Sequence, residues 1–320
     1  MSLIVAKKFN ERVFVISDTK LTYNEEEKNI ITSGTIKTII IGKEVNLSFA
    51  GYICYAEDLL KWIEINKNKI NLHDLISALK IVNVKSCYQT EFILCIGGIE
   101  IKHTEIIQIK DGKISDVESA WIGSYEAFRK FQEVYVSYNK FDIKELFGGS
   151  SIAINIIQLP SNNKVLNEFY LKNFYAMNSV IQDSKIKEVD GFIVASIYIS
   201  GSFRYLSYAY CFPLGFNKQY VINNCTSTSH TLSLGSSEEG SYAISLCGSS
   251  KISIPIYIPH GKIGILYSRK EGGLMKPTTY SDITQDDFSK KLKLININAH
   301  FINIFLDNNT IRIGTEFDEV

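Results

Sequence analysis

The first two hundred residues combine short β-branched runs with pairs of segments that have helical spacing. Runs typical of strands cover residues 3–6, 13–16, 36–41, 45–50, 91–96, 104–109, 192–199 and 204–210. Between the fourth and fifth runs, apolar residues recur at i, i+3, i+4 and i+7 in residues 56–63 and 72–79. Two further helical stripes, in residues 128–138 and 166–181, follow the sixth run. The predicted order is therefore strands, two helices, strands, two helices, strands.

Consecutive pairs of helices do not fit the alternating crossovers of a parallel sheet. Two sheets stacked face to face, with a helix pair on each outer side, would bury all of these apolar stripes. The pattern predicts an α+β fold, a four-layer α-β-β-α sandwich, for a first domain over residues 1–212.

The composition of the chain changes after residue 212. Residues 213–260 are rich in Ser, Thr, Gly and Asn, with β-prone pieces at 242–246 and 252–258. A helix over 286–294 and a strand over 301–306 complete this part. We predict a β-rich C-terminal appendage, residues 213–320, packed on the first domain because the junction YAYCFPL is apolar and unlike a flexible linker. Pro255 predicts an edge or a bulge for the strand 252–258, whose period-two alternation predicts one buried face.

Charge and composition exclude several classes of function. The 34 Lys and Arg residues balance the 34 Asp and Glu residues, which removes the nonspecific electrostatic basis for binding nucleic acid. The best apolar run, residues 191–200, is half of the roughly 20 residues that a transmembrane helix needs, and the N-terminus lacks a signal peptide's apolar stretch. The 6 cysteines form no CxxC pair and the 5 histidines are scattered, so we expect buried thiols, a cytoplasmic protein, and neither metal nor cofactor.

Four features of the first sixty residues form one pattern. Ser2 precedes a strand, Asp18 lies in VFVISDTKLT, and Lys37 lies in SGTIKTI. In LSFAGYICYAEDLL, Gly51 stands between a strand and a helix. In order and spacing these residues resemble the proteasome β-subunits and their bacterial relatives, which are N-terminal nucleophile (Ntn) hydrolases.

Two later segments extend the resemblance to about residues 2–210. AWIGSYEAF, which contains Ser124, resembles the Gly-Ser turn that opens the third helix of that family. The strand after Asp190 and Gly191 resembles the one that follows the family's Gly pair. The appendage has no counterpart in the family.

The resemblance implies a peptidase-like hydrolase that acts on an amide bond of a peptide or a small amide. Ser2, made N-terminal by removal of Met1, would be the nucleophile, with its own α-amine as the base. The charge of Lys37 favours the neutral amine, Asp18 keeps Lys37 charged and oriented, and the Gly51 N–H forms the oxyanion hole. Ser124 is a secondary candidate. Family members pack helix faces against neighbouring subunits, which implies a homo-oligomer.

Three departures from the family pattern leave alternatives open. Serine replaces the usual threonine nucleophile, the interval between Asp18 and Lys37 is longer, and KIKEVDG lacks the aspartate and serine that precede the family's Gly pair. One alternative is a non-catalytic structural or assembly subunit of the same fold. The other is a binding or sensing protein that recognises its ligand through the C-terminal appendage.

Overall fold

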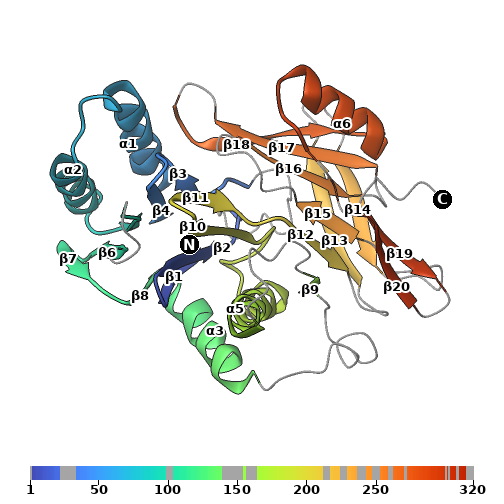
Figure 1. Ribbon diagram of the computed structural model, residues 1–320, viewed down its shortest axis with the longest axis horizontal. Helices are drawn as coiled ribbons and strands as arrows, with labels where there is room; N and C mark the ends of the chain where they lie inside the picture. Colours follow the sequence, from blue (N-terminus) through green and yellow to red (C-terminus); the bar gives the residue numbers. More distant parts are fainter. Residues whose placement is uncertain are drawn as a thin grey trace.

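The protein is a mixture of helices and antiparallel sheets, in agreement with the expected α+β class (Figure 1). The computed structural model describes residues 2–21, 34–98, 104–138, 154–155, 164–211, 217–223, 229–235, 243–246, 253–258, 262–269, 272–299, 301, 303–307 and 310–314. Met1 and the predicted boundary after residue 212 lie outside these ranges.

The N-terminal strand lies inside a five-stranded antiparallel sheet. In spatial order the strands are β11 (Ser202–Tyr205), β10 (Val194–Ile199), β2 (Arg12–Ser17), β1 (Leu3–Phe9) and β8 (Ser119–Gly123). β1 and β2 form a hairpin whose turn contains Asn10 at a φ of 55°, a conformation that asparagine tolerates better than most residues. In this hairpin Ile4 pairs with Ser17, so the start of β1 lies beside the end of β2.

A second five-stranded antiparallel sheet contains the other strands of the predicted site. Its order is β3 (Thr38–Ile40), β4 (Val45–Gly51), β5 (Thr90–Ile96), β6 (Glu105–Lys110) and β7 (Lys113–Asp116). The sequence pattern missed β7 and β8. β7 is exposed at every position, so it lacks the apolar alternation that marks a half-buried strand.

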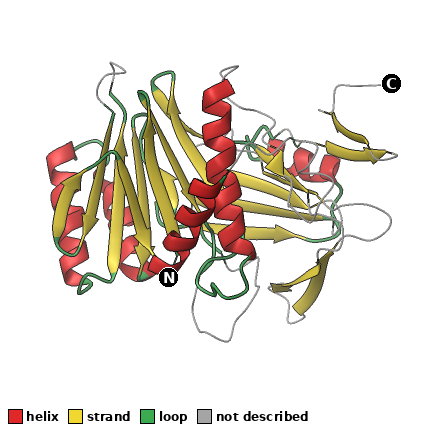
Figure 2. Cartoon of the chain, turned by 90° about the horizontal axis from the view of Figure 1, so that it is seen from below, coloured by secondary structure: helices red, strands yellow, loops and turns green. Residues whose placement is uncertain are grey.

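Helices contact both of these sheets. α1 (Ile53–Asn66) and α2 (Leu72–Lys85) contact β5 of the second sheet, whereas α5 (Lys164–Gln182) contacts β2 of the first sheet and packs along α3 (Tyr125–Ser137). The sheets contact each other through β1 and β8, which touch β4. Figure 2 shows helices on both sides of these strands. Buried residues of both sheets and all four helices belong to one hydrophobic core.

A third sheet has six antiparallel strands. Its order is β18 (Met275–Tyr280), β17 (Ile263–Arg269), β16 (Ser253–Ile258), β15 (Ala243–Leu246), β12 (Tyr208–Cys211) and β9 (Ile154–Asn155). β16 lies inside this sheet, between β15 and β17, so the predicted edge position is wrong. Every residue of β16 is buried, because Ile256 faces the main core and Tyr257 packs on Phe288 of α6 (Gln285–Leu294). The expectation of one buried face is therefore also wrong.

The predicted strand 204–210 is two strands in two different sheets. β11 pairs with β10 of the first sheet, and β12 pairs with β15 and β9 of the third sheet. The chain passes from one sheet to the other at residues 206–207 without a Gly or Pro to mark the change. Two separate hairpins complete the described part of the chain: β13 (Asn217–Asn223) with β14 (Ser229–Gly235), and β19 (Asn303–Asp307) with β20 (Thr310–Gly314).

Candidate active site

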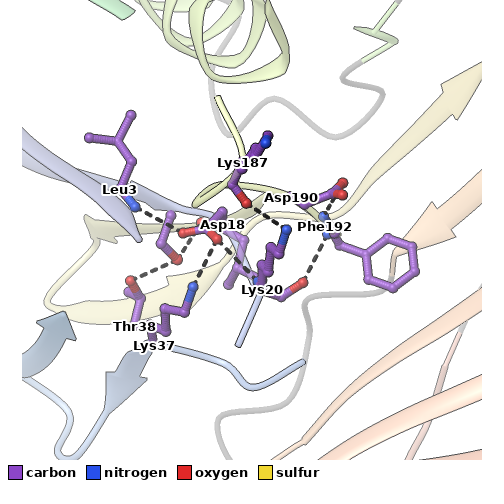
Figure 3. A network of polar contacts seen from close by, with 12 residues as sticks. Leu3, Asp18, Lys20, Lys37, Thr38, Lys187, Asp190 and Phe192 are labelled. Carbon is purple, nitrogen blue, oxygen red and sulfur yellow. Dashed lines mark hydrogen bonds and ion pairs between the residues drawn. The ribbon is translucent and has the colours of Figure 1, made fainter. Parts of the chain in front are cut away.

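A buried carboxylate at the end of β2 accepts three hydrogen bonds. Asp18 has 0% of its surface exposed. Its Oδ1 accepts from the Leu3 N–H at 3.0 Å, and its Oδ2 accepts from the Lys20 N–H at 3.1 Å. The Nζ of Lys37 donates to the same Oδ2 at 2.8 Å (Figure 3). Because Leu3 directly follows Ser2, Asp18 fixes the backbone next to the predicted nucleophile.

Lys37 lies one residue before β3 and has 2% of its surface exposed. Burial lowers the pKa of its ammonium group, and the charge and hydrogen bond of Asp18 oppose that effect. The nearby charge of Lys20 lowers the same pKa further. The carboxylate is therefore the group that favours a charged Lys37 in an environment that otherwise disfavours it.

Ser2, Lys37 and Gly51 line a single pocket of about 280 Å³. The other lining residues are Lys20, Leu21, Phe49, Ala50, Tyr52, Ile53 and Cys54. Three of the predicted site residues thus meet at one cavity, and Asp18 holds Lys37. Apolar side chains form much of the wall, so the pocket can accept an apolar group next to Ser2.

Gly51 ends β4 in a conformation that requires glycine. Its φ is 105°, and a Cβ at this position would lie 1.7 Å from the carbonyl oxygen of Gln89. Backbone N–H groups alternate between the two sides of a strand. Since the Phe49 N–H donates to the Lys37 carbonyl at 3.1 Å, the Gly51 N–H points to the same side of β4 as Lys37.

Ser124 caps α3 and contacts Ser2 through its backbone. Its Oγ accepts from the Ala127 N–H at 3.3 Å, and its N–H donates to the Ser2 carbonyl at 2.7 Å. The preceding Gly123 has a φ of 99°, and a Cβ there would lie 1.9 Å from the Ser2 carbonyl oxygen. The turn therefore holds Ser2 on the side opposite Asp18 and needs glycine to approach it.

Comparisons with known proteins give matches among solved structures alone. No family model matches the chain, and no curated protein matches it. Among solved structures, a Gly-1 mutant of Anbu from Hyphomicrobium sp. strain MC1 matches with 13% identity and a TM-score of 0.45, over 64% of this chain and 84% of that one.

Glu91 on β5 is a site residue that the sequence pattern did not indicate. Its Oε2 accepts from the Gly123 N–H at 2.9 Å, and its Oε1 lies 2.9 Å from the Nζ of Lys110. Lys110 also lies 4.0 Å from the centre of the Trp121 ring. This carboxylate therefore fixes the turn that binds the Ser2 carbonyl. A glutamate within a strand gives no sequence signal for such a contact.

The segment before Lys37 is held by the third sheet. The Oγ1 of Thr35 donates to the Met275 carbonyl at 2.8 Å, and Ile36 forms an isolated β-bridge with Met275. The hydroxyl of Tyr267 lies 3.0 Å from the position that a Cβ on Gly34 would take. Residues far along the chain thereby fix the backbone that presents Lys37.

The same sheet also holds the helix beside the pocket. Arg269 donates to the Leu60 carbonyl at 3.2 Å and lies 3.6 Å from a carboxylate oxygen of Glu64, both in α1. α1 begins at Ile53, a pocket residue. The sequence gave no signal for these contacts, because more than two hundred positions separate Arg269 from Leu60.

The segment around Asp190 packs along the chain that leaves Asp18. The Lys20 N–H donates to the Asp190 carbonyl at 3.2 Å, and the Nζ of Lys20 donates to the Lys187 carbonyl at 2.6 Å. The Phe192 N–H donates to the Oγ1 of Thr19 at 2.9 Å (Figure 3). Despite its departure from the family pattern, this segment therefore contributes to the site through its backbone.

The described part of the chain contains neither a metal-ligand cluster nor a membrane-spanning helix. Its His, Cys, Asp and Glu side chains form no group of three suited to hold a metal ion. No helix there has both the length and the apolar character that a membrane span requires.

Proposed function

We propose that this chain is a peptidase-like Ntn hydrolase with the four-layer α-β-β-α sandwich of the proteasome β-subunits. Its substrate would be a peptide or a small amide. The main support is the buried Asp18–Lys37 pair, at 2.8 Å, together with a pocket that Lys37 shares with Ser2 and Gly51. A buried ion pair of this kind is costly unless further hydrogen bonds satisfy it, and here those bonds come from the backbone next to Ser2.

Each group has a role that its position supports. After removal of Met1, the Ser2 hydroxyl would transfer its proton to its own α-amine and attack the amide carbonyl. Lys37 would favour the neutral, basic form of that amine through its positive charge. The Gly51 N–H would donate to the oxyanion of the tetrahedral intermediate. The protonated amine would then give its proton to the leaving nitrogen, and water would release the acyl group from Ser2.

Ser124 enters this proposal as a positioning residue. Its N–H holds the Ser2 carbonyl, and its Oγ is already used to cap α3. The proposal also includes a cytoplasmic location, a homo-oligomer, and residues 213–320 as an appendage to the first domain.

Covalent trapping tests the mechanism without knowledge of the substrate. The full chain is incubated with a peptide epoxyketone, which reacts with a serine or threonine that carries a free α-amine, and the adduct is located by mass spectrometry. We expect an adduct on the peptide that begins with Ser2, and an intact mass that lacks one methionine residue. Ser2→Ala should abolish the adduct, whereas Ser137→Ala, a matched change at an exposed serine on α3, should leave it unchanged.

A retained Met1 would refute the mechanism, because a peptide bond would then block the α-amine of Ser2. Adduct formation that is equal in the parent protein and in Ser2→Ala would refute it as well. Either result would favour the non-catalytic subunit or the binding protein.

A further inference from the structure

Thr35 connects the third sheet to the carboxylate of the proposed active site. Its Oγ1 donates to the Met275 carbonyl at 2.8 Å, and its N–H donates to the Thr19 carbonyl at 2.9 Å. Met275 begins β18, the edge strand of the third sheet, and Thr19 directly follows Asp18. Thr35 has 1% of its surface exposed, so both bonds are shielded from water. A residue two positions before Lys37 therefore joins β18 to the backbone beside Asp18.

Met275 contacts the chain on both sides of Lys37. Before Lys37, its carbonyl accepts from the Ile36 N–H at 3.4 Å as well as from the preceding threonine. After Lys37, its Sδ lies 3.8 Å from the hydroxyl of Tyr205, and that hydroxyl donates to the Thr38 carbonyl at 2.9 Å. Met275 and Tyr205 are both buried. The start of β18 thus helps to fix the backbone from which the Lys37 side chain projects.

A second residue of the third sheet holds Thr19. The buried hydroxyl of Tyr267 in β17 forms a hydrogen bond with the Thr19 side chain, whose Oγ1 also accepts from the Phe192 N–H at 2.9 Å. A Cβ on Gly34 would lie 2.8 Å from the Thr19 carbonyl oxygen and 3.0 Å from the Tyr267 hydroxyl. The backbone that leads to Lys37 therefore packs directly against Thr19 and the third sheet.

We propose that Thr35 is a positioning residue for the Asp18–Lys37 pair, and that the third sheet is a required part of the active site. A buried ion pair is favourable only where its geometry is closely held. A shift of β18 would carry the backbone of Lys37 with it, because Thr35 is bonded directly to Met275. The resemblance to the Ntn hydrolases ends near residue 210, so it does not include β18. The proposal rests on the proposed function in one respect, the action of the Lys37 charge on the α-amine of Ser2.

The groups around Lys37 determine what its displacement would do. Burial lowers the pKa of its ammonium, the charge and hydrogen bond of Asp18 oppose that effect, and the charge of Lys20 adds to it. Tyr205 and Tyr267 are neutral, because burial raises the pKa of both phenols. Movement of Lys37 away from Asp18 should therefore make its ammonium lose its proton more readily.

Competitive labelling with acetic anhydride measures the state of Lys37 without any substrate. The full chain is labelled briefly, and mass spectrometry compares acetylation of Lys37 with that of Lys61, an exposed lysine of α1. Thr35→Val removes the hydroxyl but leaves the Met275 carbonyl its bond from the Ile36 N–H, so the variant should fold. It should raise the acetylation of Lys37 by about two- to tenfold, which is the loss of one hydrogen bond expressed as a ratio of rates.

Two control variants accompany this measurement. Thr35→Ser restores the hydroxyl and should return the acetylation of Lys37 to the parent value. Tyr257→Phe removes another buried hydroxyl of the third sheet, which donates to the Ile283 carbonyl at 3.1 Å in the separate core around α6. This variant should leave the acetylation of Lys37 unchanged.

Trapping of Ser2 by the peptide epoxyketone gives the second readout. Thr35→Val should slow trapping at neutral pH and shift the acid limb of its pH profile to higher pH, because the Ser2 amine holds its proton more tightly when the positive charge at Lys37 is weaker. Thr35→Ser should restore both the rate and the profile. A loss of stability alone would not move this pH profile.

The outcomes separate this proposal from the proposed function. Equal acetylation of Lys37 in the parent protein and in Thr35→Val would overturn it. An equal rise in Tyr257→Phe would overturn it too, because the effect would then be one of general loosening. Raised acetylation with an unchanged pH profile of trapping would show that the contact does not serve the active site. A parent protein that traps no epoxyketone would refute the proposed function, and the labelling of Lys37 would still decide whether Thr35 positions the pair.

Discussion

Asp18→Asn isolates the cost of burying Lys37 without its counter-charge. Asparagine keeps a carbonyl oxygen for the Leu3 N–H, which Asp18 now binds at 3.0 Å. It removes the negative charge that opposes the desolvation of Lys37, whose pKa is already lowered by burial. Removing one partner of a buried pair typically destabilises a protein by about 3–5 kcal/mol.

The pH dependence of this cost follows from the direction of the pKa shift. A lysine whose folded-state pKa lies below its unfolded value releases its proton first in the folded protein. The penalty for burying the ammonium is therefore complete below the folded pKa and is relieved as the pH rises towards the unfolded pKa. It cannot exceed the free energy of deprotonating Lys37 in the unfolded chain, which is about 4.6 kcal/mol at pH 7 and about 1.9 kcal/mol at pH 9.

Urea unfolding at pH 7, 8 and 9 measures the effect. The free energy of unfolding of Asp18→Asn should approach that of the parent protein as the pH rises, with the gap narrowing by up to about 1.4 kcal/mol per pH unit. In Asp18→Asn with Lys37→Met no ammonium is buried, so the free energy of unfolding of this double variant should lack the pH dependence that Lys37 gives to Asp18→Asn. A cost of Asp18→Asn that stays constant from pH 7 to pH 9 would refute the argument that Lys37 is charged by virtue of Asp18.

Two further predictions concern the turn at Ser2 and the assembly. Gly123→Ala should lower the free energy of unfolding by well over 2 kcal/mol and abolish trapping of Ser2, because its Cβ would meet the Ser2 carbonyl oxygen at 1.9 Å. Gly201→Ala is the matched control, since Gly201 also has a positive φ, of 75°, but has open space around its Cβ. It should lower the free energy of unfolding by only about 1–2 kcal/mol. Light scattering at micromolar concentration should give a multiple of the 36.2 kDa chain, and a monomer at that mass would contradict the proposed homo-oligomer.

Local periodicity predicted most elements of the first two hundred residues, because the buried face of each helix or strand follows from the spacing of its own apolar residues. Apolar stripes at Leu59 and Leu79, for example, lie on the buried faces of α1 and α2. The resemblance to the Ntn hydrolases also predicted that Ser2, Lys37 and Gly51 act together, and the structure brings all three to one pocket. Their catalytic roles stay predictions.

Contacts between distant segments could not be predicted in this way. Nothing near Leu206 in the sequence shows that the chain leaves one sheet for another, because both halves of the run are equally β-prone. Glu91 is indistinguishable from a solvated strand residue until β8 places the Gly123 N–H beside it. Met275 and Thr35 are 240 positions apart, so no local pattern relates them. These contacts depend on which strands pair, and local patterns in a single sequence do not reveal that pairing.

The identity of residue 18 follows from the contacts that the site requires. The Leu3 N–H donates to one carboxylate oxygen of Asp18, the Lys20 N–H donates to the other oxygen as well as to the Asp190 carbonyl, and the buried ammonium of Lys37 needs a negative charge. Asparagine supplies one acceptor and no charge. Glutamate supplies both acceptors and the charge, but its extra methylene would displace either Leu3 or Lys37 in a close-packed interior. Aspartate satisfies all three at these distances, and it thereby couples the backbone beside Ser2 to the charge of Lys37.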